Sequence, residues 1–501
     1  MSNGMDPDQP EASRRQLIKY PGVGASFVTA DPIAGGGAAR ADTSASEQDT
    51  QRDGGTHGRV WRAGDHHVHS EYSGAFDTST SPPAFAKGAD GIYPIVTNAI
   101  MAKRFGLTWA MCTDHGGPAH SKVNLEQAYP DLLRSRRLVP EVLQFWGMEF
   151  DAPAQDHHTL MIPRHAGEAE QLFELESRFA KLDPFPVDPS RDTEAMMIEF
   201  LTFAKAAPDR PLVIAHHASR SATGLGVYGQ DTPRAFRNGN DVAPDVYVGF
   251  EGAPGHQAGP LIGQARGAYG NYPTHGGYDQ MAARVGGLWD SLLGEGRRWW
   301  ITATSDSHVH WTRGGADFWP GEYSKTYVFA RQDYGDVMDA VRNGRIWVTT
   351  GDLIRTLDLT ARHGQVRRAA AMGESLTVTR RGPTEVDIEI SFRPLQGINA
   401  NGDRPTVRRV DLIVGQIAGP GTDRNAETNP TTKVVARFGL HDWRRRGSAY
   451  VIGHTLRNVE TDIYARVRGT NTDEAEPLAD GKENPWTDLW FYSNPVFIHF
   501  R

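Results

Sequence analysis

Histidine is concentrated in the first two thirds of this chain. Fourteen of the 19 histidines lie between His66 and His310, and only four follow residue 356. Histidine is the commonest metal ligand in proteins and the commonest general acid or base near neutral pH. This distribution predicts that residues 65–310 carry out chemistry that needs imidazoles.

The strongest local motif is DHHVHS at residues 65–70. In an extended segment, His67 and His69 project from the same face, so both could bind one metal ion. His66 then faces the other way. This spacing alone is equally compatible with a solvated histidine cluster.

A second motif, Thr113-Asp114-His115, follows the apolar run at residues 109–112. In this motif His115 can bind a metal, and Asp114 can hold an imidazole in the required tautomer. The alternative is an aspartate that caps a helix beside a surface histidine.

Three more motifs follow the same pattern. Glu149 ends an apolar run, where a carboxylate can bridge two cations, and His158 begins the next expected strand. His216 comes directly after the apolar residues 213–215, and Asp306 and His308 repeat the two-residue spacing. Any one motif could be structural. Five in succession, each at an expected strand end, favour a metal centre.

The elements that must position these residues follow an α/β pattern. From residue 61 onward, short β-branched or aromatic runs alternate with helical stretches, and strands are expected to end at residues 113, 149, 215, 251 and 305. Barrel enzymes of α/β type assemble their active sites at the C-terminal ends of their strands. A helix over residues 336–343, stopped by Gly344, closes this domain near residue 355.

Beyond residue 355 the pattern changes to strands alone. Eight strands without helices predict a β-sandwich domain over residues 356–501. The expected strands are 357–360, 376–379, 386–392, 407–414, 434–438, 449–452, 463–467 and 489–498.

Composition narrows the function further. The chain has 501 residues and a net charge of -8, which argues against nucleic acid as a main partner. The single cysteine, Cys112, lies in an apolar run and is expected to be a core thiol. No apolar run reaches the roughly 18 residues that a membrane-spanning helix needs, so we expect no membrane span.

The first 60 residues differ from the rest. Small and polar residues dominate residues 35–56, which predicts a disordered N-terminus over residues 1–60. Residues 13–19 (SRRQLIK) resemble a twin-arginine export signal, and residues 39–41 (ARA) have the form of a cleavage site. If this signal is real, the twin-arginine machinery exports the protein to the periplasm or beyond. If it is only a basic patch, the protein is cytoplasmic.

In this order, the motifs resemble the polymerase and histidinol phosphatase (PHP) family of metal-dependent phosphoesterases, over residues 61–355. The stretches at residues 61–70 (WRAGDHHVHS) and 341–345 (VRNGR) look most like the branch that includes a carbaryl hydrolase. The resemblance implies a distorted barrel of seven β/α units. It also implies two or three divalent ions, usually zinc, manganese or iron.

The resemblance implies eight metal ligands in three groups: His67, His69 and Asp306 for a first ion; Glu149, bridging to a second ion, with His158 and His216; and His115 with His308 for a third. The family usually has a further Asp or His seven residues after the first motif histidine. Here that residue is Gly74. Asp77 or Glu71 would have to supply the missing carboxylate.

The expected reaction is hydrolysis of a small phosphomonoester or phosphodiester by a hydroxide that bridges the cations. The residues expected to be catalytic are Asp114, Glu149, Asp306 and His308. The same centre could instead hydrolyse an ester, amide or carbamate. A non-enzymatic alternative is a secreted binding protein with a structural metal site.

Four residues are candidates for contacting the substrate. Arg220 could bind an anionic oxygen, although a surface arginine is the simpler interpretation. His217 stands where the family often has proline, and it either faces the substrate or packs. Glu251 and His256 could line the pocket or belong to a structural turn.

Overall fold

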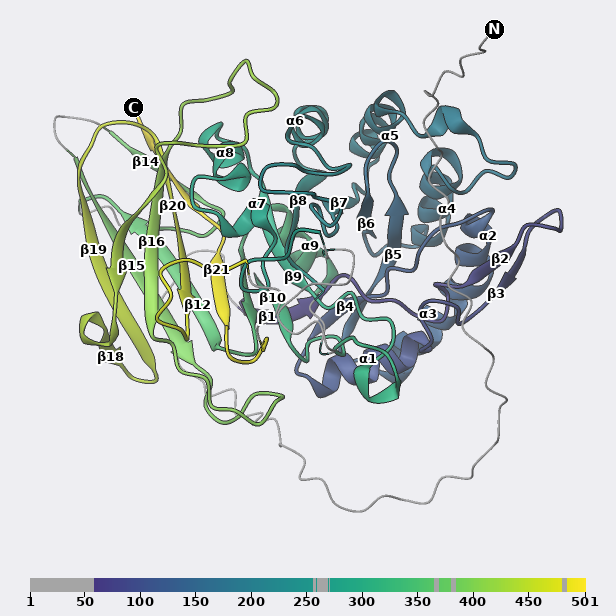
Figure 1. Cartoon of the computed structure of the whole chain (residues 1–501), viewed down its shortest axis with the longest axis horizontal. Coiled ribbons are helices and arrows are strands. Elements are labelled where there is room, and N and C mark those ends of the chain that lie inside the picture. Colours follow the sequence, from purple (N-terminus) through teal and green to yellow (C-terminus); the bar gives the residue numbers. More distant parts are fainter. Residues whose placement is uncertain are drawn as a thin grey trace, which may run out of the picture. The chain divides into compact units, whose positions relative to one another are not determined.

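A large central sheet runs through the described part of the chain, and helices flank its first half (Figure 1). The computed structural model describes residues 58–255, 258, 269, 271–364, 369–379, 384–479 and 484–501, all within one unit, residues 51–501. The export signal, the candidate residue His256 and most of the N-terminus predicted to be disordered lie outside the described residues. Only residues 58–60 of that N-terminus are described, and there the prediction is wrong, because Arg59 pairs with Asp336 and Val60 begins a strand.

The first half of the large sheet follows the order β10-β1-β4-β5-β6-β7-β8-β9. Its strands are β1 (Val60–Asp65), β4 (Trp109–Met111), β5 (Leu143–Asp151), β6 (His157–Ile162), β7 (Leu212–Ala215), β8 (Tyr247–Pro254), β9 (Trp300–Thr304) and β10 (Ser324–Ala330). Four neighbouring pairs (β1 with β4, β4 with β5, β7 with β8, β8 with β9) are parallel, and β6 is antiparallel to both of its neighbours.

Helices connect and cover these strands: α1 (Ile95–Arg104), α2 (His120–Val123), α3 (Tyr129–Leu138), α4 (Glu168–Phe179), α5 (Glu194–Ala206), α6 (Pro233–Val242), α7 (Gln280–Ala283), α8 (Leu288–Gly294) and α9 (Tyr334–Arg342). Strand β7 is buried along its whole length, as its unbroken apolar sequence predicts for a strand covered on both faces. Helix α9 begins at the cap Asp333 and ends just before Gly344, whose φ of +66° suits glycine.

The ladder of backbone hydrogen bonds does not close between β9 and β10 in the described residues. A side chain joins the two strands instead, because Thr326 Oγ1 lies 2.8 Å from both the backbone N and the backbone O of Ala303. The chain is a mixed α/β protein. Its large sheet curves so that β9 and β10 lie beside each other, but no ladder of backbone hydrogen bonds closes it among the described residues.

From Ile354 onward, the described residues form strands, with one short 3₁₀ turn, Leu440–Asp442. They are β12 (Ile354–Arg362), β13 (Ala370–Ala371), β14 (Ser375–Val378), β15 (Thr384–Pro394), β16 (Arg409–Gln416), β17 (Lys433–Phe438), β18 (Arg444–Arg446), β19 (Ala449–Val459), β20 (Ile463–Thr470), β21 (Trp490–Ser493) and β22 (Val496–Phe500). The single strand expected over residues 489–498 is two strands, because Asn494 and Pro495 interrupt it.

These strands belong to two sheets that share one apolar core. Strands β13, β12, β15, β19 and β18 form a separate sheet, and the others continue the large sheet. Leu359, Ile390 and Val467, from both sheets, lie in the same buried cluster. Strand β21 pairs with β11 (Ile346–Thr350), so the large sheet continues across the expected domain boundary at residue 355. That boundary stays a prediction.

Among the described residues, no helix has both the length and the apolar character needed to cross a membrane.

Candidate metal centre

The chain segments that follow β1 and β9 lie against each other. Backbone hydrogen bonds of 2.9 Å run from Asp306 N to His67 O and from His69 N to Ser307 O. Gly255 permits the close approach of the segment after β8, because a Cβ there would lie 2.5 Å from the Asp306 Cβ. The two motifs with two-residue spacing therefore meet at one end of the sheet.

His67, His69 and Asp306 form the first ligand group. The two histidine Nε2 atoms are 3.1 Å apart, and each lies 3.0 Å from Asp306 Oδ1. All three side chains are buried. On its other side, His67 places Nδ1 2.7 Å from Glu251 Oε1. A carboxylate only accepts hydrogen bonds, so His67 donates through Nδ1 and presents Nε2 to the other two residues.

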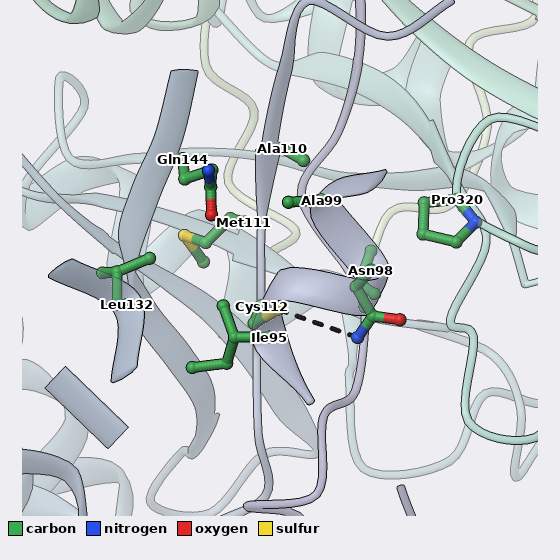
Figure 2. A pocket seen from close by; sticks show the side chains of 10 residues that line it. Ile95, Asn98, Ala99, Ala110, Met111, Cys112, Leu132, Gln144 and Pro320 are labelled. Carbon is green, nitrogen blue, oxygen red and sulfur yellow. Dashed lines mark hydrogen bonds between the residues drawn. The ribbon is translucent and has the colours of Figure 1, made fainter. Parts of the chain in front are cut away.

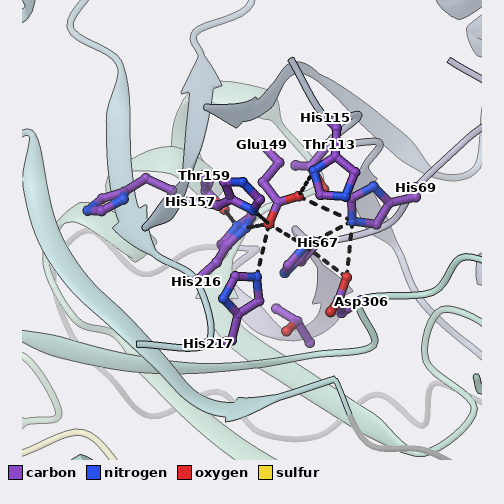
Figure 3. Close-up of polar contacts among 12 residues, drawn as sticks. His67, His69, Thr113, His115, Glu149, His157, Thr159, His216, His217 and Asp306 are labelled. Atoms are coloured by element: carbon purple, nitrogen blue, oxygen red, sulfur yellow. Dashed lines mark hydrogen bonds and ion pairs between the residues drawn. The ribbon is translucent and has the colours of Figure 1, made fainter. Parts of the chain in front are cut away.

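Glu149, on β5, lies at the centre of a ring of imidazoles (Figure 3). Its Oε1 is 3.0 Å from His216 Nδ1, 3.1 Å from His217 Nε2 and 3.1 Å from His157 Nδ1. Its Oε2 lies 2.6 Å from His115 Nδ1. The two oxygens of this one carboxylate thus face different groups of histidines.

A third group forms around Asp90, a residue that no motif in the sequence indicates. Asp90 Oδ2 lies 3.1 Å from His115 Nε2 and 3.0 Å from His308 Nε2. Asp90 therefore provides a carboxylate for this group, which Gly74 has no side chain to provide. Neither residue suggested for this role reaches the group, since Glu71 pairs with Lys87 and Asp77 accepts a hydrogen bond from Ser79 N.

Electrostatics in this cluster favour a charged carboxylate beside three protonated imidazoles, whereas burial lowers the pKa values of His69, His216 and His217. Burial favours the neutral acid, but His157, His115 and His67 hold the pKa of Glu149 well below its usual range. Burial also lowers the pKa of an imidazole, yet the surrounding carboxylates raise the pKa values of His67 and His115 well above the usual range. Glu149 and Asp151 together raise the pKa of His157 to about 9.

The residues fit divalent cations on two observations. The Nε2 atoms of His67 and His69 converge with a carboxylate oxygen of Asp306 at 3.0–3.1 Å, an arrangement that only a proton or a cation can stabilise. Glu149 Oε2 is buried, and its 2.6 Å contact with His115 Nδ1 does not have hydrogen-bond geometry, so this oxygen has no hydrogen bond among the described residues. Imidazole and carboxylate donors together suit zinc, manganese and iron.

Potential ligand atoms within 4.8 Å of one another form five overlapping groups. These are His67, Glu149, His216 and His217; His69, His115 and His308; His66, His216 and Glu251; His67, His69 and Asp306; and His115, Glu149 and His157. The described part of the chain thus brings together every predicted metal ligand except His158.

His157 lies beside Glu149, where we expected His158. In the antiparallel β5–β6 pair, Glu149 is opposite Thr159 and Asp151 is opposite His157, so these four side chains share a face of the sheet. His158 points to the other face, where its Nε2 lies 2.7 Å from the hydroxyl of Tyr247.

Other predicted residues lie one layer further out. Asp114 accepts hydrogen bonds from Ser70 and Ser73, and among the described residues no hydrogen bond or ion pair joins it to an imidazole. Glu251 is completely buried behind His67. Arg220 forms a two-point ion pair with Asp156, and its side chain is 29% exposed.

An apolar pocket is lined by residues from α1, α3 and the segment of β4, among them Ile95, Met111, Cys112 and Leu132 (Figure 2). Asn98 Nδ2 contacts the Cys112 sulfur at 3.9 Å and donates to His69 O at 2.8 Å. Burial raises the pKa of the Cys112 thiol. These observations agree with a core thiol.

Comparison with models of known protein families finds no match, and no curated protein matches the chain. Among solved structures, the chain is similar to a two-domain protein from Bacteroides vulgatus that contains a predicted PHP-like metal-dependent phosphoesterase. The two chains are 13% identical with a TM-score of 0.35, over 91% of this chain and 99% of the other. That TM-score is too low to support a conclusion about fold or activity.

Proposed function

We propose that the protein is a metal-dependent hydrolase of the PHP type that cleaves a small phosphomonoester or phosphodiester. The observation that carries this proposal is the position of Glu149. Its Oε1 faces His216 and His217, while its Oε2 faces His115. A carboxylate shared in this way is suited to hold two cations side by side, an arrangement common in enzymes that act on phosphate esters.

The proposed ligand groups are the ones that the contacts define. His67, His69 and Asp306 would hold a first ion; Glu149, His216 and His217, with His157 beside them, a second; and Asp90, His115 and His308 a third. When bound, such ions lower the pKa of a water molecule and neutralise negative charge on the attacked group.

The chain's own residues orient these ligands and the substrate. Glu251 holds the Nδ1 proton of His67, so that Nε2 faces Asp306. Arg220 is the candidate for binding an anionic oxygen. Burial lowers its pKa, but Asp156, Glu149 and Asp306 raise it above the usual value, which indicates that its charge acts close to the centre.

An ester, amide or carbamate hydrolase with the same ligands is the second candidate, since activated water attacks acyl groups as well. A binding protein with a structural metal is disfavoured, because a structural site is closed by four ligands and this cluster offers more than twice that number.

Substrate turnover separates these candidates. The full chain should release p-nitrophenol from p-nitrophenyl phosphate or bis-p-nitrophenyl phosphate, and a chelator should abolish the release. Cleavage of p-nitrophenyl acetate alone would transfer the proposal to the acyl hydrolase. No turnover of any of the three, with metal bound, would favour the binding protein.

Two further expectations, on the fold and on the location of the protein, are part of this proposal. We infer that β1 and β4 to β10 form the distorted barrel of the PHP type and that the two C-terminal sheets form a β-sandwich. We also propose export through the twin-arginine machinery. Replacement of Arg14 and Arg15 by lysine should then retain a reporter fused to the chain in the cytoplasm.

A further inference from the structure

Ser73 lies at a junction behind the ligand groups. It is completely buried, and its Oγ is 2.8 Å from His69 Nδ1, 2.9 Å from Asp114 Oδ1 and 3.2 Å from His115 N. Its backbone carbonyl accepts hydrogen bonds from the backbone N–H groups of Asp90 and Gly91. One serine therefore touches three of the segments that carry proposed ligands.

The hydrogens at Ser73 can be assigned without ambiguity. A serine hydroxyl has one proton to donate and two lone pairs to accept with, and a carboxylate can only accept. The Ser73 hydroxyl therefore donates to Asp114, and it accepts from the backbone N–H of His115. Its remaining lone pair meets His69 Nδ1, which must then carry the hydrogen.

This assignment leaves His69 Nε2 without a hydrogen in the neutral ring. That atom is the one that faces Asp306 Oδ1 at 3.0 Å. Without Ser73 the tautomer preference of His69 would reverse, because Asp306 would accept the ring hydrogen from Nε2 and no acceptor would hold it on Nδ1.

We propose that Ser73, held by Asp114, is the positioning residue that keeps His69 in its metal-binding tautomer and fixes the backbone of Asp90. This inference rests on the proposed metal centre. It gives Asp114 a role that passes through a serine, and it links the first and third ligand groups through one side chain.

Three substitutions test it. Ser73→Ala removes the acceptor of the His69 hydrogen. Ser70→Ala is the matched control, because Ser70 is equally buried and also donates to Asp114, at 2.7 Å, but touches no imidazole. Asp114→Asn should be tolerated, since Ser70 N–H lies 2.6 Å from Asp114 Oδ1 and would hold the amide oxygen where Ser73 donates.

The experiment titrates metal-free full-length protein with Co²⁺ and records binding by calorimetry and the visible absorption of the bound ions. Ser73→Ala should weaken one site by about 10- to 100-fold and change its absorption band, while Ser70→Ala and Asp114→Asn keep both. If Ser73→Ala does not fold, Asp114→Leu should show the same loss, because the freed Ser73 hydroxyl would then donate to His69 Nδ1.

Equal affinity and equal spectra for Ser73→Ala and Ser70→Ala would overturn the inference and leave the metal centre intact. A loss in Asp114→Asn as large as in Ser73→Ala would also overturn it. Failure of the wild-type protein to bind Co²⁺ would refute the proposed metal centre, and this inference with it.

Discussion

Replacing Glu251 by glutamine should damage the first ligand group although the change is isosteric. Three donors point at this carboxylate: His67 Nδ1 and Thr304 Oγ1 at Oε1, and His217 N at Oε2, each at 2.7 Å. A glutamine has only one oxygen. The backbone N–H of His217 can only donate, so placing the glutamine NH₂ against it would leave two donors in contact and cost about 1–3 kcal/mol. The amide nitrogen must therefore face His67.

The amide hydrogen would then force His67 into the opposite tautomer, with its hydrogen on Nε2. Loss of such a supporting carboxylate typically weakens metal binding about 10- to 100-fold, which corresponds to about 1.4–2.8 kcal/mol. Calorimetric titration of metal-free protein with Zn²⁺ measures the effect. Thr304→Val is the matched control, because it removes one donor to Glu251 and leaves His67 unchanged. Wild-type affinity in the Glu251→Gln protein would refute the reasoning.

Three further predictions concern the same region. Asp90→Asn should lower the metal bound at saturation, as determined by elemental analysis, whereas Asp77→Asn, an exposed carboxylate of the same segment, should not; equal loss in both would contradict the role of Asp90. Because the pKa values of His67 and His115 are raised, both imidazoles carry a proton at pH 7 that a metal ion must displace. Metal binding should therefore release protons and become stronger as pH rises. Calorimetry in buffers of different ionisation enthalpy measures the release, and its absence would contradict this. Burial lowers the pKa of His158 from 6.5 to about 3 in the folded protein. Below pH 6.5 the unfolded chain therefore binds a proton at His158 that the folded protein does not bind. The free energy of unfolding of metal-free protein should fall by about 2 kcal/mol between pH 6.5 and 5. Chemical denaturation of His158→Gln should show a smaller fall, and an identical slope would count against it.

Much of the candidate centre could be predicted from the sequence, because strand ends carry a local signal. His67 and Asp306 each come directly after an expected strand, and the sheet brings those strand ends together. The strand expected over residues 386–392 likewise predicted β15, whose inward residues Ile388 and Ile390 are buried.

Two site residues depend on information that lies outside any local pattern. The choice between His157 and His158 depends on the register of β5 against β6, and a shift of one residue exchanges the two faces. Asp90 reaches the centre from a loop, because its backbone N–H binds the carbonyl of Ser73. No strand pattern or motif spacing in the sequence predicts that contact.

Metal content tests the central claim most directly. Purified full-length protein, supplied with zinc or manganese and then freed of excess ion, should contain about two or three equivalents by elemental analysis. Glu149→Gln should contain fewer, because the shared carboxylate is lost. Wild-type protein without bound metal, or a Glu149→Gln variant with the same content, would contradict the account.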